Sequence, residues 1–319
     1  MTHTLRLRLV ALLLLLCPTL LAQKPAPMQP LKGPLTFYIA NDLGRNGYYE
    51  QRPIAELMGR MAETVGPECV FAAGDVHHFD GVASTADPLW TTNFETIYAH
   101  PELMISWHPI LGNHEYRGCT QAVLDYSKVS RRWVMPARYY TKSYSHKGVS
   151  IRFVLIDTTP LIERYRKDRE EYPDAVGQDA EQQLRWLDST LTAAKEQWVV
   201  VIGHHPIYAI TGKADSERTD LQARLDPILC RHHVDLYVAG HIHNFQHHRA
   251  SGSDIDYVVN SSASLARPIE EERSTSPADG LQFAAGCEGF SVVTATTKQL
   301  LLSFIDKEGR TIYQVNRSK

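Results

Sequence analysis

Five short apolar segments of this 319-residue chain each end in a small polar cluster, and this repetition restricts the folds that the chain can adopt. Short apolar segments are typical of buried β-strands. The clusters occupy residues 41–44, 74–78, 112–115, 203–206 and 240–244. Because ligands bind beyond the carboxyl ends of the strands in open α/β sheets, the clusters predict one site that several strands share.

Strands and helices alternate along the first part of the chain. Buried strands are predicted at residues 35–40, 70–73, 109–111, 151–156, 199–202 and 236–239. Apolar residues recur at helical spacing in residues 52–64, 89–98, 180–194 and 221–232, and Asp179 is a suitable N-cap for the third helix. Four further strands, at residues 256–260, 290–295, 300–305 and 311–315, follow without helices between them. This order predicts an α/β fold in which two sheets are flanked by helices.

The N-terminal segment has the features of a secretory signal peptide. Two arginines precede an apolar core at residues 9–16, and Ala22 is the small residue that a cleavage site requires. The core is shorter than the roughly 20 residues that span a bilayer, and no later segment is long and apolar enough. We therefore expect removal of residues 1–22 and export, to a periplasm or outside the cell. Lipid attachment at Cys17 is the alternative, although Leu16 is bulkier than the residue that normally precedes a lipidated cysteine.

Residues 23–33 are rich in proline, which is typical of a linker, and residues 34–319 are expected to form one domain. The composition, 43% hydrophobic and 22% charged, is that of an ordinary globular protein. With 33 basic against 36 acidic residues, the chain lacks the positive charge by which a dedicated nucleic-acid-binding protein neutralises a phosphate backbone. The 15 histidines are the first sign of metal or acid–base chemistry.

Four cysteines lie beyond the predicted signal peptide: Cys69, Cys119, Cys230 and Cys287. In an oxidising compartment three pairings are open to them, and the sequence does not choose between these pairings. Cys69 begins an apolar segment and Cys230 ends a helical pattern, so both are also candidates for buried free thiols.

The polar clusters contain five motifs: Asp42-Leu43-Gly44, Gly74-Asp75-Val76-His77-His78, Gly112-Asn113-His114-Glu115, Gly203-His204 and Gly240-His241-Ile242-His243. In this order they resemble the calcineurin-like metallophosphoesterases, and most closely the small purple acid phosphatases of the tartrate-resistant type. The likeness continues at residues 126–133, 183–187 and 241–246 and extends over essentially residues 35–315. The resemblance implies a single-domain, four-layer α/β/β/α sandwich.

The resemblance also implies a centre of two metal ions. One ion would be bound by Asp42, Asp75, His243 and the residue at position 78, and the other by Asp75, Asn113, His204 and His241. Two cations about 3.5–4 Å apart repel each other, so the carboxylate of Asp75 is the expected bridge. Oxygen and imidazole donors together suit zinc, manganese or iron.

Position 78 departs from the family pattern. Purple acid phosphatases have a tyrosine there, whose phenolate binds iron(III) and gives the colour, whereas this chain has His78. An imidazole is neutral, and a trivalent ion loses most when an anionic ligand is replaced. We therefore expect two divalent ions, such as zinc, manganese or iron(II), and no iron(III)–tyrosinate centre. The alternatives are that His78 points away from the metal or that His77 substitutes for it, although strand alternation would direct His77 to the opposite side.

His114 is the candidate catalytic residue. An imidazole beside Asn113 can hydrogen-bond a phosphate oxygen or protonate the leaving group, and Glu115 is expected to fix its tautomer. A purely structural role is the alternative for His114. His205 either lines the pocket or packs behind it.

Further basic residues lie outside these assignments. Four histidines are candidates for the pocket rim or for the solvated surface: His77, His108, His247 and His248. The basic run at residues 164–169 alternates with acidic residues and is expected to be an exposed loop.

Together these residues predict an exported phosphatase that acts on small phosphate monoesters. By resemblance, a metal-bound hydroxide would attack phosphorus in line, without a phosphoenzyme. A phosphodiesterase or nucleotidase on the same scaffold is the first alternative, and a non-catalytic metal-binding protein is the second.

Overall fold

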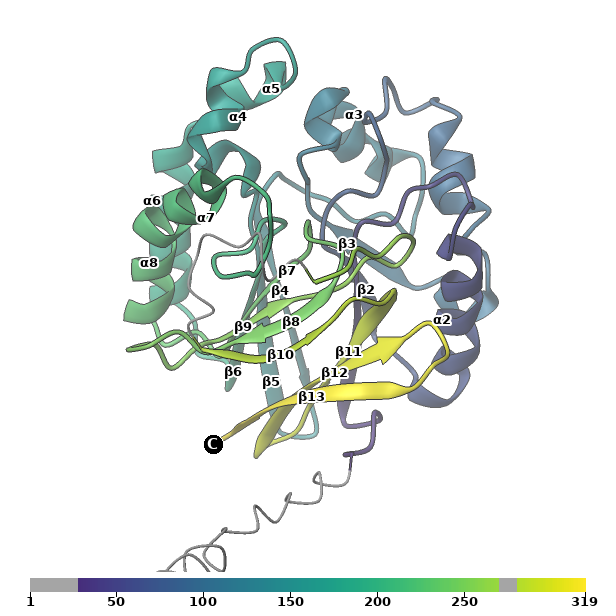
Figure 1. The fold of residues 1–319 in the computed structure, drawn as a ribbon. Helices are drawn as coiled ribbons and strands as arrows, with labels where there is room; N and C mark the ends of the chain where they lie inside the picture. Colours follow the sequence, from purple (N-terminus) through teal and green to yellow (C-terminus); the bar gives the residue numbers. More distant parts are fainter. Residues whose placement is uncertain (1–27, 270–279) are drawn as a thin grey trace, which may run out of the picture.

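Two β-sheets lie face to face at the centre of the molecule, and helices cover the outer side of each (Figure 1). The computed structural model describes residues 28–269 and 280–319. The predicted signal peptide, Cys17 and residues 23–27 of the predicted linker lie outside the described residues. The expected four-layer α/β/β/α sandwich is confirmed. Within the described residues, no helix combines the length and the apolar character needed to cross a bilayer.

The first sheet has six strands in the order β13-β12-β11-β1-β2-β3. Its parallel strands are β1 (Leu35–Ala40), β2 (Cys69–Ala72) and β3 (Ser106–Pro109). Its antiparallel strands are β11 (Gly289–Ala295), β12 (Gln299–Asp306) and β13 (Thr311–Ser318). β11 pairs with β1, so the end of the chain completes the sheet in which the chain begins.

The second sheet has seven strands in the order β10-β8-β9-β7-β6-β5-β4. Its parallel strands are β5 (Val149–Leu155), β6 (Trp198–Ile202), β7 (Leu236–Ala239) and β9 (Asp256–Val259). Its antiparallel strands are β4 (Tyr140–His146), β8 (Phe245–His248) and β10 (Leu281–Ala285). Parallel strands require crossover connections, and helices form several of these connections.

Helices form the two outer layers (Figure 1). On one side lie α2 (Gln51–Val65), α3 (Thr120–Asp125) and the π-helix η1 (Thr91–Glu95). On the other lie α4 (Glu163–Lys167), α5 (Pro173–Val176), α6 (Ala180–Thr192), α7 (Asp215–Arg224) and α8 (Asp226–Arg231). Single 3₁₀ turns are η2 (Pro101–Leu103), η3 (Glu115–Arg117), η4 (Tyr126–Lys128) and η5 (Thr159–Leu161). The predicted cap of α6 is confirmed, because Oδ1 of Asp179 accepts a hydrogen bond from the Gln182 N–H at 2.8 Å.

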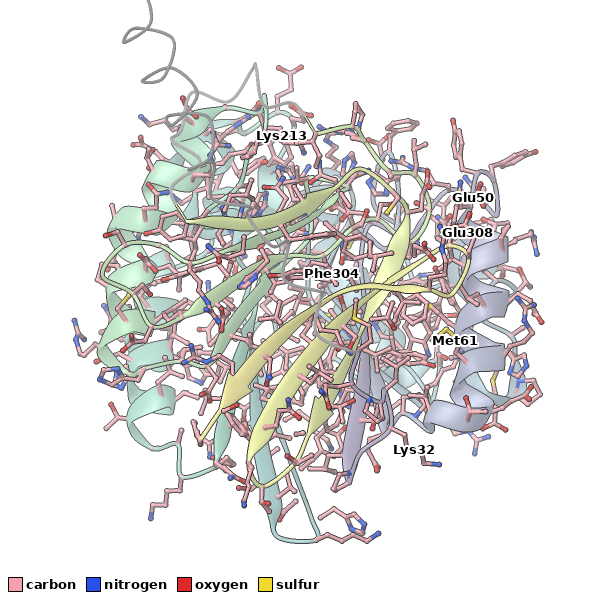
Figure 2. The ribbon with its side chains drawn as sticks, turned by 60° about the horizontal axis from the view of Figure 1, so that its bottom comes forward. Lys32, Glu50, Met61, Lys213, Phe304 and Glu308 are labelled. Carbon is pink, nitrogen blue, oxygen red and sulfur yellow. The ribbon has the colours of Figure 1, made fainter. Side chains whose placement is uncertain are left out.

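Aromatic side chains join the two sheets. Phe37 of β1 packs edge to face on Phe153 of β5, with ring centroids 4.8 Å apart. Phe304 of β12 stacks on Phe245 of β8 at 4.5 Å. Figure 2 shows Phe304 in the middle of the molecule, with Lys213 and Glu50 toward one end and Lys32 at the other. Burial of such rings supplies much of the stability of a sandwich core.

Several predicted boundaries are wrong. The segment expected as one helix at 221–232 is two helices, because Pro227 is tolerated in the first turn of α8 but not within a continuous helix. The strand expected at 109–111 ends at Pro109. The basic run at 164–169 is not a loop, because α4 covers most of it and buries Tyr165.

The four cysteines beyond the predicted signal peptide are all free thiols in the structure.

Asp157 is a buried carboxyl residue directly after β5. Its main-chain N–H and C=O both bond to the side-chain amide of Gln183 in α6, at 2.8 Å each. Its side chain accepts a hydrogen bond from the Tyr116 hydroxyl. Burial raises the pKa of Asp157 from 3.8 to about 7. The folded protein therefore holds this proton more tightly than the unfolded chain does.

We expect Asp157→Asn to gain stability relative to the unmodified protein as the pH rises. The protonated carboxyl stabilises the fold fully below pH 3.8, and this contribution is lost as the pH rises through about 7. The amide of the variant does not titrate, so the difference in the free energy of unfolding should change by up to about 4 kcal/mol across this interval. Denaturant unfolding at pH values on both sides of the interval measures it. A difference that is independent of pH would contradict the expectation.

Candidate metal centre

Both sheets contribute side chains to one end of the sandwich. Asp42, Asp75 and Asn113 follow β1, β2 and β3 of the first sheet. His204, His241 and His243 follow β6 and β7 of the second sheet. These are the carboxyl ends of parallel strands, so the loops meet above the sheets as predicted (Figure 1).

The backbone around these residues is unusual. Asp42, Asp75, His241 and His243 all have positive φ values, of 53°, 52°, 70° and 64°. Left-handed backbone costs a non-glycine residue about 1–3 kcal/mol and clusters at functional sites. The packing is also tight, since a Cβ atom at Gly112 would lie 2.2 Å from Oδ1 of Asp75. The surrounding structure therefore holds these loops in a strained backbone conformation that places the side chains at the site.

Asp75 is the most central carboxylate. Its Oδ2 lies 3.1 Å from Nε2 of His204, 3.5 Å from Nε2 of His78 and 3.8 Å from Nε2 of His114. Burial by itself would raise the pKa of this carboxyl, but the rings of His204 and His114 outweigh burial and hold the pKa well below 3.8. The side chain is therefore an anion surrounded by imidazoles.

Asp42 forms a second contact of this kind. Its Oδ1 lies 2.9 Å from Nε2 of His243, and both side chains are buried. Burial opposes ionisation, but His243 lowers the pKa of Asp42 far below its usual range. Two buried carboxylates so near each other need positive charge between them.

The donor atoms fit metal ions. Ligand atoms of Asp42, His78 and His243 lie within 4.8 Å of one another, as do those of Asp42, Asp75 and His204. Within the described residues, Oδ1 of Asn113 and both ring nitrogens of His78 are buried without a hydrogen-bond partner. Burial lowers the pKa of His78 well below 6.5, so its ring is neutral and can offer a lone pair. Oxygen and imidazole donors in this mixture suit divalent transition ions.

Each of the three histidines at the strand ends has one ring nitrogen held by an acceptor. Nδ1 of His204 bonds to the carbonyl of Ala73 at 2.9 Å, and Nδ1 of His243 bonds to the carbonyl of Leu265 at 2.8 Å. For His241 the acceptor is a carboxylate, because Nε2 lies 3.0 Å from Oε2 of Glu217. Such contacts orient a ligating histidine and leave its other nitrogen for the metal.

Glu217 is a site residue that the sequence did not reveal. It is buried in α7, and its Oε1 accepts hydrogen bonds from Tyr165 at 2.8 Å and Arg164 at 2.9 Å. The Tyr165 hydroxyl lies 3.2 Å from Nε2 of His205. One carboxylate therefore ties α4, α7 and two histidines together. A single glutamate in a polar helix carries no local signal of such a role.

We expect Glu217→Gln to weaken metal binding without unfolding the protein. The amide keeps the size of the side chain but removes the charge that supports His241, and loss of such an outer contact typically costs about 10- to 100-fold in metal affinity. Competition with a chelator measures this affinity. Glu56→Gln, on the exposed face of α2, is the matched control. Equal affinities for the Glu217 variant and this control would show that Glu217 does not support the centre.

Lys213 also lies close to the centre, although no sequence motif predicted this. It is half-buried, and its Nζ lies 3.0 Å from Nε2 and 3.3 Å from Nδ1 of His241. Burial lowers the pKa of Lys213 to about 8. A cation at this place adds positive charge beside the two carboxylates.

His114 lies at the open edge of the centre, partly exposed. Its ring centroid is 4.2 Å from that of His78, and its Nδ1 bonds to the carbonyl of Phe79. The prediction that Glu115 fixes the tautomer of His114 is wrong. The carboxylate of Glu115 instead accepts hydrogen bonds from the backbone N–H groups of Gly112, Asp75 and His77, at 2.7, 2.9 and 3.1 Å. Glu115 thus shapes the two loops, while a backbone carbonyl orients His114.

The remaining candidate histidines lie elsewhere or behind the site. His205 packs behind His241, with ring centroids 4.3 Å apart. His77 does not replace His78, because its ring packs on Trp90; strand alternation is not the reason, since β2 ends at Ala72. Those expected at the rim or the surface are instead buried in the fold: His108, His247 and His248. These residues lie in strands β3 and β8, where neighbouring side chains cover them.

The comparisons with known proteins agree with this geometry. The sequence profile of the calcineurin-like phosphoesterases matches residues 35–245, which include all seven predicted metal ligands. The chain therefore belongs to the calcineurin-like phosphoesterases, which are metal-dependent enzymes.

Relatives within the family are acid phosphatases. Purple acid phosphatase 4 of Arabidopsis thaliana is 30% identical over 97% of this chain and 94% of that protein. Tartrate-resistant acid phosphatase type 5 of Sus scrofa is 28% identical over 82% of this chain and 78% of that protein. These two likenesses confirm the predicted resemblance.

Several solved structures resemble this chain in their fold. One of them, GAP50, the anchor in the inner membrane complex of Plasmodium, superposes with a TM-score of 0.75. The two chains are 21% identical, over 89% of this chain and 88% of that one. At this identity the likeness concerns the fold alone.

Proposed function

We propose that this chain is an exported phosphatase that hydrolyses phosphate monoesters at a centre of two divalent ions. The main support is the place of Asp75, which belongs both to a group of donors with Asp42 and His204 and to one with His78 and His114. A carboxylate shared between two donor groups is what a pair of ions requires. The named acid phosphatases among the relatives support a phosphomonoester as substrate.

The proposed ligands divide into two sets that share Asp75. The first ion would be held by Asp42, Asp75, His78 and His243. The second would be held by Asp75, Asn113, His204 and His241, the last through Nδ1 because Nε2 faces Glu217.

When bound, two such ions would polarise the phosphoryl oxygens and activate a water molecule for in-line attack. In that reaction the water oxygen would form the new bond to phosphorus, and the leaving oxygen would depart with the electron pair of the broken bond. His114 would then give a proton to that oxygen. Its Nδ1 is engaged by the Phe79 carbonyl, so Nε2 is the ring atom available for this transfer.

His78→Tyr is expected to change which metal the site prefers. The unpartnered ring of His78 beside Asp75 supports a neutral ligand at this position, whereas a phenolate would add a negative charge that favours iron(III). The unmodified protein loaded with iron should therefore lack an intense phenolate charge-transfer band, and the variant should show one. Visible spectroscopy measures both. A band in the unmodified protein, or none in the variant, would remove position 78 from the ligand set.

The proposed activity is tested by metal analysis of the purified mature protein together with a panel of phosphate esters. We expect two ions per chain and faster hydrolysis of monoesters than of diesters. Preference for a diester would establish the phosphodiesterase alternative. A metal-loaded protein that hydrolyses neither class would be a non-catalytic metal-binding homologue.

The export part of the proposal is supported by the sequence pattern of residues 1–22 alone. N-terminal sequencing of the protein recovered outside the cytoplasm tests it. A mature N-terminus near Gln23 is expected, and an intact N-terminus would contradict cleavage.

A further inference from the structure

A cavity opens directly beside the predicted ligand His78. Its volume is about 370 Å³, and it is lined by Arg45, Tyr48, Tyr49, His78, Phe79 and Leu265. None of the residues other than His78 belongs to a motif of the sequence analysis. The cavity shares a wall with the metal centre, so a group of the substrate next to the reacting phosphate can enter it.

Arg45 is the charged residue of this cavity. The residue is only 7% exposed, yet within the described residues Nε and Nη1 have no hydrogen-bond partner, and Arg45 forms no ion pair. Its guanidinium instead lies over the ring of Phe79, 5.2 Å from the centroid. Burying a cation with unsatisfied donors is costly. A planar fork of N–H donors is well suited to two oxygens of a phosphate group.

Three exposed aromatic rings surround Arg45. Tyr48, Tyr49 and Phe79 are 73%, 64% and 73% exposed, although each is a large ring that burial would stabilise. Together with the apolar side chain of Leu265 they line one hollow rather than standing apart on the surface. An exposed apolar cluster of this kind marks a binding surface.

The loop that carries two of these rings is firmly held. Oε1 of Gln51 accepts hydrogen bonds from the N–H groups of Arg45 at 3.0 Å and Gly47 at 2.7 Å. Oδ1 of Asn93 accepts from the Asn46 N–H at 2.7 Å. Tyr49 has a φ of 54°, a strained value for a residue with a large side chain. The rings are therefore presented by a rigid backbone, which lowers the entropic cost of binding.

We propose that this cavity is a leaving-group subsite that binds the ring of an aryl phosphate monoester, while Arg45 donates hydrogen bonds to oxygens of the same phosphate. The proposal rests on the proposed phosphatase function and specifies its substrate class. The aromatic rings account for the ring of the leaving group, and the unpaired guanidinium accounts for the anionic oxygens next to it.

The test measures binding rather than turnover. Calorimetry on the zinc-loaded mature protein compares phenylphosphonate, which carries an aromatic ring and cannot be hydrolysed as an ester, with methylphosphonate. Tyr48→Ala should weaken phenylphosphonate binding by about three- to tenfold, the usual value of one aromatic contact, and leave methylphosphonate binding unchanged. Phe79→Ala removes the ring that also packs on Arg45, so it should weaken the binding of both phosphonates and that of phenylphosphonate more. Both side chains are exposed, so neither change disturbs the core. Met104→Ala, at an exposed residue that does not line the cavity, is the matched control.

Arg45 is tested with two variants. Arg45→Gln should weaken both phosphonates by about tenfold or more, and Arg45→Lys should recover only part of the loss because a lysine lacks the planar fork. Equal losses for both phosphonates in the aromatic variants, or no preference of the unmodified protein for the phenyl compound, would overturn the subsite. Methylenediphosphonate, which carries a second phosphonate group, is a further probe. If its binding alone depended on Arg45, Arg45 would bind a second phosphate, and the proposed subsite would again be overturned.

The two proposals fail separately. Hydrolysis of monoesters without phenyl-specific binding overturns the subsite and leaves the phosphatase function intact. Phenyl-specific binding that depends on Phe79 and Arg45, in a protein that hydrolyses no monoester, supports the subsite and overturns the proposed function.

Discussion

Asp75→Asn is expected to reduce the metal content below two ions per chain and to abolish most turnover. Oδ2 of Asp75 lies within 3.5 Å of ring nitrogens from both His78 and His204, which belong to the two proposed ligand sets. Two unit charges 4 Å apart repel by about 4 kcal/mol at an effective dielectric constant of 20, and doubly charged ions by about four times as much. An asparagine cannot supply the negative charge that offsets this repulsion.

The loss should concern the metal rather than the fold. Oδ1 of Asp75 accepts a hydrogen bond from the backbone N–H of His114 at 3.0 Å, and the side-chain carbonyl of an asparagine can accept the same bond. Metal analysis after gel filtration and thermal unfolding of the apo-protein separate the two effects. Asp254→Asn, an exposed aspartate before β9, is the control. If the Asp75 variant kept both ions and near-normal turnover, Asp75 would not be the bridge.

His114→Ala should give the opposite pattern, with metal content preserved and turnover reduced by about 10²- to 10⁴-fold, the usual range for a general acid. The ring lies at the open edge of the centre, with Nε2 3.8 Å from Oδ2 of Asp75. It is therefore close enough to reach a leaving oxygen without being required to hold the ions together.

The loss in the His114 variant should depend on the leaving group. An alkoxide needs a proton in order to depart, whereas a phenolate with a low pKa needs little help. Rates of the variant and the unmodified protein on aryl and alkyl phosphates measure this difference. An equal loss on both classes would assign His114 to orienting the phosphate or to structure.

Much of the fold was predictable because its signals are local. The apolar segments that became β1, β2, β6 and β7 are short, uninterrupted and followed by glycine and polar residues. β4 and β8 were missed because Tyr140–His146 and Phe245–His248 carry many polar side chains, and their pairing with neighbouring strands outweighs this polarity.

The predicted metal ligands come together in the structure for the same reason. Asp42, Asp75, Asn113, His204 and His241 stand at strand ends, and a parallel sheet brings all such ends to one edge. The proposed roles of these residues stay predictions until ions are measured. Their proximity follows from the order of strands alone.

The sequence by itself thus determined the sandwich, the donor types and the edge at which they gather. The tertiary structure decided which partner holds each ring: Glu217 for His241, the Phe79 carbonyl rather than Glu115 for His114. It also placed Arg45 unpaired among exposed aromatic rings. These contacts join residues from different loops and helices, and hydrogen bonds and burial depend on three-dimensional distance, which no local spacing of residues encodes.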